Sequence, residues 1–209
     1  MLNRARVIWP RTSGLGPFFA VSMQPAAREL LVALAPVASR WGRWYLFGAQ
    51  AVVVHGVPRL SADLDITLAL EPETPDRFVQ DMQTAGFEPL VSDPAFVIQT
   101  RVLPFVHTAT GMPLDVVLAA SGLEDDFLTR AIEIDLDGTR VPVIHVEDLI
   151  IGKILAGRPK DIEDVRNLWT LHASTADRER IVQVLTLLED ALSQSDLIPA
   201  FDAVARRRP

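Results

Sequence analysis

The chain has 209 residues, of which 49% are hydrophobic and 22% are charged, so its composition is that of a globular protein and not of a disordered one. A formal net charge of −7 argues against a nucleic-acid-binding surface that covers the whole protein. The sequence contains no cysteine and no apolar run of membrane-spanning length, which excludes disulfide bonds, cysteine-ligated zinc and a membrane partner and fits a cytoplasmic location.

Residues 1–22 differ from the rest of the chain, because they mix Arg, Pro and Gly without a hydrophobic period. We expect this segment to be peripheral or poorly ordered. It lacks a convincing small-residue cleavage site, so a signal peptide is not indicated. Met23 directly precedes a helical pattern, and a start at Met23 is therefore an open alternative.

Hydrophobic spacing predicts strands and helices that alternate through the first two-thirds of the chain and helices alone after that. The predicted strands are 44–47, 62–70, 87–90, 96–103, 105–108, 113–119 and a hairpin within 131–145. The predicted helices are 25–39, 48–54, 74–85, 124–130, 146–156, 160–172, 176–193 and 196–206. This order predicts an α/β core over residues 23–145 and a C-terminal helical bundle over 146–209.

Two aspartates, Asp63 and Asp65, interrupt the otherwise apolar strand at 62–70. Side chains two apart on a strand point to the same face, so we expect the two carboxylates to project side by side. Such close carboxylates repel each other unless a cation lies between them, and Mg²⁺ prefers oxygen ligands of this kind. A solvated edge strand is the alternative, although Asp is depleted in strands.

The residues before this pair resemble the signature of the nucleotidyltransferase superfamily, which is an apolar residue, Gly, then Gly or Ser, a spacer and Asp-x-Asp on a strand. Here the signature reads Phe47, Gly48, Ala49, thirteen further residues and then Asp63-Leu64-Asp65. Ala49 departs from the Gly or Ser of the family, but its backbone N–H remains available to a phosphate.

The lead-in to the strand, Arg59-Leu60-Ser61-Ala62, also resembles a form that is common in this superfamily. The resemblance implies that Gly48, Ala49, Arg59 and Ser61 contact a nucleoside triphosphate. It also implies a mixed sheet with flanking helices for the α/β core.

In the same superfamily a third carboxylate comes from a strand beside the Asp-x-Asp strand. Asp115 fits this role, because it begins an apolar strand in which a lone Asp is unusual. The resemblance therefore implies that Asp63, Asp65 and Asp115 are catalytic and bind Mg²⁺, while a strand-capping role for Asp115 stays open. A second Asp-x-Asp, at Asp135 and Asp137, precedes Gly138 and indicates a hairpin turn instead.

The stretch 153–164, KILAGRPKDIED, contains Gly157 and Pro159, which predict the end of one helix and the start of the next. It resembles a stretch in the AbiEii/MenT-type toxin nucleotidyltransferases in which a Lys and an Asp are active-site residues. Matched to this sequence they are Lys153, which would also grip a phosphate, and Asp161. The alternative is a surface Lys and an acidic first helical turn.

Taken together, the resemblance implies a Mg²⁺-dependent nucleotidyltransferase that moves a nucleoside monophosphate from a nucleoside triphosphate to a hydroxyl of tRNA or protein. It further implies the toxin of a toxin–antitoxin pair, with an antitoxin protein as partner. Two alternatives stay open: an antibiotic nucleotidyltransferase with a small-molecule acceptor, and a nucleotide-binding module of the same fold with weak turnover. The sequence contains no Walker loop and no dinucleotide-binding fingerprint.

Overall fold

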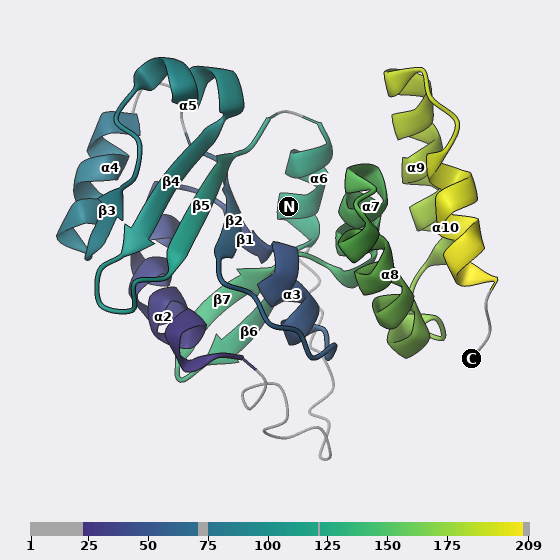
Figure 1. Cartoon of the computed structure of the whole chain (residues 1–209), viewed down its shortest axis with the longest axis horizontal. Coiled ribbons are helices and arrows are strands. Elements are labelled where there is room, and N and C mark those ends of the chain that lie inside the picture. The colour runs from purple at the N-terminus through teal and green to yellow at the C-terminus, as the bar shows by residue number, and fades with distance from the viewer. Residues whose placement is uncertain (1–22, 71–74, 121, 207–209) are drawn as a thin grey trace, which may run out of the picture.

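The computed structural model describes residues 23–70, 75–120 and 122–206. The expectation for residues 1–22 and the predicted helix start at Thr74 lie outside this range. Within it, one mixed sheet has the strand order β3-β4-β5-β2-β1-β7-β6 (Figure 1). The strands are β1 (Trp44–Phe47), β2 (Leu64–Leu68), β3 (Phe87–Pro89), β4 (Val102–His107), β5 (Pro113–Leu118), β6 (Ile132–Leu136) and β7 (Thr139–Val143).

The predicted α/β fold with a mixed sheet and a helical C-terminal part is confirmed by the arrangement of the elements. The helices are α2 (Pro25–Trp41), α3 (Gly48–Val54), α4 (Pro75–Thr84), α5 (Pro94–Thr100), α6 (Leu123–Arg130), α7 (Val146–Ala156), α8 (Pro159–His172), α9 (Arg178–Leu192) and α10 (Leu197–Ala205). None of the helices in the described ranges is both long and apolar enough to cross a membrane.

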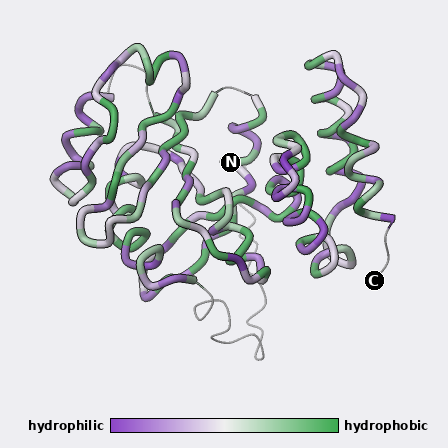
Figure 2. Tube along the Cα trace, viewed as in Figure 1, coloured by the Kyte–Doolittle hydropathy of each residue, from purple (hydrophilic) through white to green (hydrophobic). Residues whose placement is uncertain are grey.

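β2 is the centre of the sheet, and its two neighbours run in different directions. β1 pairs with it antiparallel, and β5 pairs with it parallel. Leu64, Ile66 and Leu68 are fully buried on one face of β2, whereas Asp65 on the opposite face is half-buried. Hydrophobic stretches run through these central strands (Figure 2). β2 therefore has one apolar face and one face that carries polar groups.

The apolar face packs against α2 and α4. Leu30, Leu31 and Leu34 of α2 are fully buried, as their helical spacing predicts. Edge-to-face ring contacts continue from Trp41 of α2 to Phe78 of α4 and on to Phe105 of β4, with centroids 6.0 and 6.2 Å apart. This side of the protein is a hydrophobic core between the sheet and two helices.

The strand predicted at 96–103 is wrong for its first half, which forms α5. Asp93 caps this helix by accepting a hydrogen bond from the Ala95 N–H at 2.9 Å, and Pro94 occupies its first turn. Val97 and Ile98 suggest a strand by composition, but the cap and the proline favour a helix. The helix ends where Arg101 adopts a left-handed φ of 57°.

The strands predicted at 96–103 and 105–108 are replaced by one continuous strand, β4, that passes through Pro104. The Pro104 carbonyl accepts a hydrogen bond from the Leu90 N–H at 2.8 Å, on the side where β3 ends at Pro89. The nitrogen of Pro104 faces the same side, so its missing N–H leaves the pairing of β4 with β5 intact. The hairpin predicted around Asp137 and Gly138 is present as β6 and β7.

The helices α7 to α10 stand beside the polar face of the sheet (Figure 1). α7 packs against α8 and α9, and α10 packs against all three. The chain turns between α7 and α8 at Gly157, which has a left-handed φ of 64°, and Pro159 then begins α8. This turn brings the last part of α7 and the first part of α8 to the same side.

An ionic network fixes α6 against α7 and α9. Asp148 of α7 is completely buried, and it accepts hydrogen bonds from Arg130 of α6 at 3.0 Å and from Arg180 of α9 at 2.8 Å. Arg130 also pairs with the buried Glu147, and Arg180 pairs with Asp126 of α6 at 2.6 Å. α6 is thus held by charged contacts at both of its ends.

Candidate active site

The polar face of the sheet carries two rows of side chains in register across β1, β2 and β5. The first, which we call the aspartate row, consists of Phe47, Asp65 and Asp115, since Phe47 pairs with Asp65 and Asp65 pairs with Asp115. The second, which we call the hydroxyl row, consists of Tyr45, Thr67 and Val117. The rows are about 6 to 7 Å apart, because each strand residue rises about 3.3 Å.

Asp63 differs from its expected position, because β2 begins at Leu64 and not at residue 62. Asp63 is exposed just before the strand, where its Oδ1 accepts a hydrogen bond from the Ser61 hydroxyl at 2.6 Å. The strand is shortened because residues 61–63 have no ladder partner. Only Asp65 of the pair is held within the sheet.

The three aspartates influence one another electrostatically. Burial, and then the charges of Asp63 and Asp115, raise the pKa of Asp65 to about 6, while Lys153 and Arg158 oppose the shift. Burial and the charge of Asp63 also raise the pKa of Asp115. Carboxylates from two strands and the loop before β2 therefore repel one another in one small region, and the cations of α7 and α8 lie near enough to soften that repulsion.

Gly48 lies directly against the aspartate row. Its φ is +66°, and a Cβ placed on it would lie 2.0 Å from Oδ2 of Asp65. Any larger residue at position 48 would therefore displace the Asp65 carboxylate. Ala49 follows in the first turn of α3 and is 8% exposed. The glycine of the sequence motif is thus explained by close approach of the backbone to a carboxylate.

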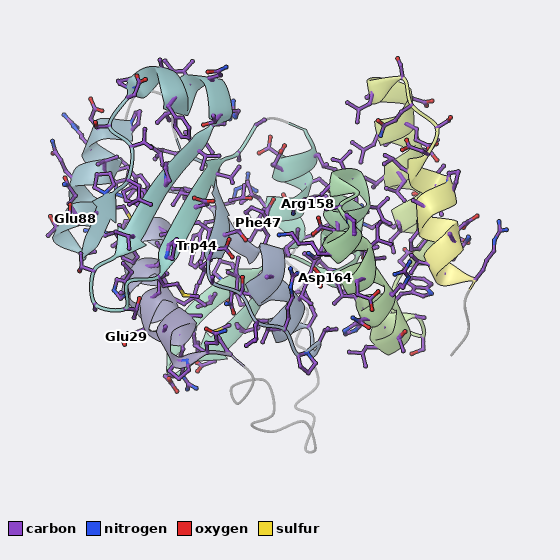
Figure 3. All side chains as sticks on the ribbon, viewed as in Figure 1. Glu29, Trp44, Phe47, Glu88, Arg158 and Asp164 are labelled. Carbon is purple, nitrogen blue, oxygen red and sulfur yellow. The ribbon has the colours of Figure 1, made fainter. Side chains whose placement is uncertain are left out.

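A cavity of about 330 Å³ lies between this face of the sheet and the helices α6, α7 and α8. Among the site residues predicted from sequence, Gly48, Ala49, Arg59, Ser61, Asp63, Asp65, Lys153 and Asp161 line it. Asp115 is half-buried beside Asp65 but is not among the lining residues. Figure 3 shows Phe47 on the sheet side, with Arg158 and Asp164 across from it on the helical side.

Lys153 belongs to a buried ionic network on the helical wall of the cavity. The residue is 6% exposed, and its Nζ donates to Asp161 Oδ1 at 3.1 Å and to Asp164 Oδ2 at 2.6 Å. Arg158 pairs with Asp161, and Arg59 pairs with Asp164. Two carboxylates thus hold three cations together at one end of the cavity.

Burial would raise the pKa of Asp161, but hydrogen bonds from Arg158 and Lys153 outweigh it and lower the pKa. Asp161 therefore stays ionised and is suited to orienting Lys153. The roles of Asp164 and Arg158 in this network were not predicted from the sequence. The signal was the spacing of Asp161 and Asp164, which lie three apart and so on one helical face.

The donor set fits a hard divalent cation in its chemistry. Asp63, Asp65 and Asp115 offer only oxygen ligands, and their mutual repulsion is relieved by a cation. In the conformation described, no group of three or more His, Cys, Asp or Glu among the residues described is placed closely enough to hold a metal ion. Asp63 would have to turn from Ser61 toward Asp65 to complete such a set.

Solved structures with the same fold include two of the antibiotic-resistance factor ANT(2'')-Ia. Its solution structure shares 13% identity, with a TM-score of 0.53 over 80% of this chain and 92% of that chain. Its crystal structure with adenylyl-2''-tobramycin shares 14% identity, with a TM-score of 0.52 over 80% and 98%. An antigenic nucleotidyltransferase-like protein from Paracoccidioides brasiliensis shares 15% identity, with a TM-score of 0.51 over 84% and 92%. These identities show a common fold only.

Among curated proteins, no sequence match was found. The sequence profile of one family, described as nucleotidyltransferase of unknown function (DUF6036), matches residues 42–175. That range is more than half of the chain and includes the aspartate row, Gly48 and the Lys153 network. The narrower likeness to AbiEii/MenT-type toxins has no counterpart in these matches. The chain therefore belongs to the nucleotidyltransferase family DUF6036.

Proposed function

We propose that this protein transfers a nucleoside monophosphate from a nucleoside triphosphate to a hydroxyl group, with Mg²⁺ as cofactor. One observation carries the proposal: Asp65 and Asp115 lie in register on neighbouring strands, and Gly48 approaches Asp65 so closely that no side chain fits between them. A purely structural pair of aspartates would not need a left-handed glycine in front of it. The family and the fold support the same reaction class.

In the reaction, the acceptor oxygen forms a bond to the α-phosphorus of the nucleotide. The bond between that phosphorus and the bridging oxygen of the β-phosphate breaks, and pyrophosphate leaves with the bonding electrons. The hydroxyl proton passes to the carboxylate of Asp115 or to water. Mg²⁺ bound by Asp63, Asp65 and Asp115 would supply charge neutralisation at the phosphates and acidify the attacking hydroxyl.

The remaining residues bind and orient the phosphates. Lys153, Arg158 and Arg59 form the positive end of the cavity, where a triphosphate is favoured by charge. Lys153 contacts phosphate as a compact ammonium, while Asp161 and Asp164 hold its position. Backbone groups at Gly48 and Ala49 and the side chain of Ser61 complete the nucleotide site in this proposal. α3 has only seven residues, so its dipole contributes little.

Three hypotheses about the function differ in the acceptor that they require. The sequence resemblance favours a hydroxyl of tRNA or protein, and with it a toxin that has an antitoxin partner. A small-molecule acceptor is favoured by the cavity of about 330 Å³, which is lined by the sheet and by residues of α3, α6, α7 and α8. The third hypothesis, a nucleotide-binding module with weak turnover, is favoured by Ala49 and by the double engagement of Lys153 with two carboxylates.

The test is a labelling screen of the full chain with each of four α-³²P-labelled nucleoside triphosphates and Mg²⁺. Total tRNA, cell lysate and a set of small hydroxyl compounds serve as acceptors. Asp65→Asn should abolish label transfer while Asp135→Asn, in the distant hairpin, leaves it unchanged. Nucleotide binding without transfer to any acceptor would favour the binding module, and absence of Mg²⁺-dependent nucleotide binding would refute the proposal.

A further inference from the structure

The cavity continues from the aspartate row to the hydroxyl row, which no part of the proposed nucleotide chemistry uses. Tyr45 and Thr67 are both 3% exposed, and their side chains are hydrogen-bonded to each other. Leu123 and Phe127 of α6 and Leu149 of α7 cover this row with apolar surface. The hydroxyl row and its cover therefore form a second, largely apolar end of the cavity.

Glu124 is the one carboxylate that α6 contributes to the lining of this cavity. It is half-buried and lies near enough to Tyr45 that, after burial, its charge adds to the rise in the pKa of the Tyr45 hydroxyl. Within the described residues, no cation lies within 4.0 Å of Glu124 and no hydrogen bond satisfies it. Glu124 is therefore a carboxylate at the cavity whose charge no cation of the described residues neutralises, so it can pair with a cationic ligand.

The two acidic residues that follow Glu124 behave differently. Asp125 pairs with Arg43 at 3.7 Å, and Asp126 pairs with Arg180 at 2.6 Å. These two already provide negative charge in the first turn of α6, where it stabilises the helix. Helix stability alone therefore does not account for Glu124, which faces the cavity while its neighbours contact protein arginines.

α6 presents Glu124 rigidly. The contacts of Arg130 with Asp148 and of Arg180 with Asp126 hold α6 against α7 and α9. A charge on a fixed helix defines a ligand position more sharply than a charge on a loop. The cavity thus has a basic end made by Lys153 and Arg158 and, beyond the aspartate row, a fixed acidic group at an apolar end.

We propose that Glu124 is the specificity-determining residue for the acceptor, and that the acceptor is a small amino alcohol whose ammonium group binds Glu124. The inference rests on the proposed nucleotidyl transfer and adds the chemical class of the second substrate. The acceptor's hydrocarbon part lies over the hydroxyl row, and its hydroxyl points toward Asp115, one row away. A polyanionic acceptor such as RNA is disfavoured, because its phosphates would be repelled by Glu124.

The experiment measures binding by calorimetry, with and without nucleoside triphosphate and Mg²⁺, using the full chain. The probes are ethanolamine, choline and tobramycin, the N-acetylated forms of ethanolamine and tobramycin, and total tRNA. At least one of the amines should bind. Its neutral counterpart, which is the N-acetylated form or, for choline, a neutral isostere, should bind roughly tenfold or more weakly. Total tRNA should not compete with the amine.

Glu124→Gln should weaken amine binding roughly tenfold or more and bring the ratio between charged and neutral forms close to one. Asp125→Asn is the matched control, because it removes a neighbouring charge that faces Arg43, and it should keep the wild-type ratio. A merely structural role for Glu124 would change stability but leave this ratio as it is.

Three results would overturn the inference: no amine in the set binds, amines and neutral forms bind equally to the wild type, or Glu124→Gln keeps the ratio. If nucleotide binding by the wild type persists in those cases, the proposed function stands and only the acceptor class is wrong. If amines bind in a Glu124-dependent manner but nucleotide does not bind, the proposed function fails instead.

Discussion

Asp65 is half-buried beside Asp115, and its pKa is raised to about 6 by burial and by Asp63 and Asp115. A carboxyl group whose pKa is raised by folding does not lower the free energy of unfolding below about pH 4, where it is protonated in the folded and the unfolded state. Above about pH 6, where it is ionised in both states, it lowers that free energy by the full amount that the pKa shift represents. Asp65→Asn should therefore raise the free energy of unfolding at pH 8 by about 1 to 3 kcal/mol, because one pKa unit corresponds to about 1.4 kcal/mol.

Urea unfolding of the metal-free proteins at pH 4 and pH 8 measures this difference. At pH 4 the variant and the wild type should have nearly equal stability. His55 acts in the opposite direction, because burial lowers its pKa to about 4 and its Nε2 donates to the Ile144 carbonyl at 2.8 Å. The contribution of neutral His55 to the free energy of unfolding is complete above pH 6.5, and it is lost as the pH falls toward 4. A variant that is less stable than the wild type at pH 8 would show that Asp65 stabilises the fold.

Lys153 is buried, so its replacement cannot be treated as a surface substitution. Lys153→Met leaves Asp161 and Asp164 with Arg158 and Arg59 as partners, and we expect a loss of about 3 kcal/mol. In the double variant Lys153→Met/Asp164→Asn much of this loss should be regained, since one buried charge disappears with its partner.

Thermal melts of the two single variants and the double variant give the coupling between Lys153 and Asp164. Losses that add without coupling would contradict a shared network. Nucleotide binding should be weak in every variant that lacks Lys153, including the double variant with restored stability. This separation distinguishes phosphate binding from support of the fold.

Two glycines at helix ends allow the strain of a left-handed backbone to be separated from a steric clash. Gly48 has φ +66° and Gly157 has φ +64°, but a Cβ at Gly157 would come no closer than 3.8 Å to the Ile154 carbonyl oxygen. Gly157→Ala should cost about 1 kcal/mol from backbone strain alone. Gly48→Ala should cost more and should also weaken nucleotide binding, because its Cβ would displace Asp65.

Chemical denaturation and nucleotide titration of both alanine variants check this prediction. Equal losses of stability with unchanged nucleotide binding would mean that Asp65 can move aside freely. The comparison is matched, since both glycines are at a helix terminus and have nearly the same φ.

Most elements could be predicted because hydrophobic period, glycine and proline agree locally, as in α2, β2 and the turn at Gly157. α5 could not, because its β-branched residues suggested a strand while a single cap at Asp93 and a proline determined a helix. Asp63 was placed inside β2, since sequence shows the alternation of side chains but not where the ladder partners end.

The site could be predicted in part at the scale of the whole molecule. The sequence motif predicted that Gly48 and Asp65 belong to the site, and the apolar strand around Asp115 predicted the same for Asp115. The fold places these three residues together. The partners of Lys153 and the isolation of Glu124 could not be predicted, because they depend on how α6, α7 and α8 pack. Side-chain pairing across distant elements leaves no period in the sequence.

The division into a core up to residue 145 and a helical part from 146 remains a proposal. The contacts of Arg130 with Asp148 and of Arg180 with Asp126 cross that boundary, so we expect both parts to unfold together. Asp148→Asn should lower the melting temperature by roughly 6 to 12 °C, for a loss of about 3 kcal/mol.

Near-ultraviolet and far-ultraviolet circular dichroism of the wild type should show one coincident transition. Two separate transitions, of which only one shifts in Asp148→Asn, would show that residues 146–209 form an independent unit. Asp125→Asn, on the outer side of α6, should shift the melting temperature by little.

The order of the elements along the chain also determines when during synthesis the candidate site is assembled. β2 carries Asp65 early in the chain, β5 brings Asp115 about fifty residues later, and α8 completes the cationic wall only after residue 164. A ribosome-bound chain that has emerged only as far as β5 holds opposed carboxylates without the ammonium that moderates them. Such a nascent chain lacks the cationic wall, so under the proposed function we expect transfer activity only after the C-terminal helices have left the ribosome and packed against the sheet.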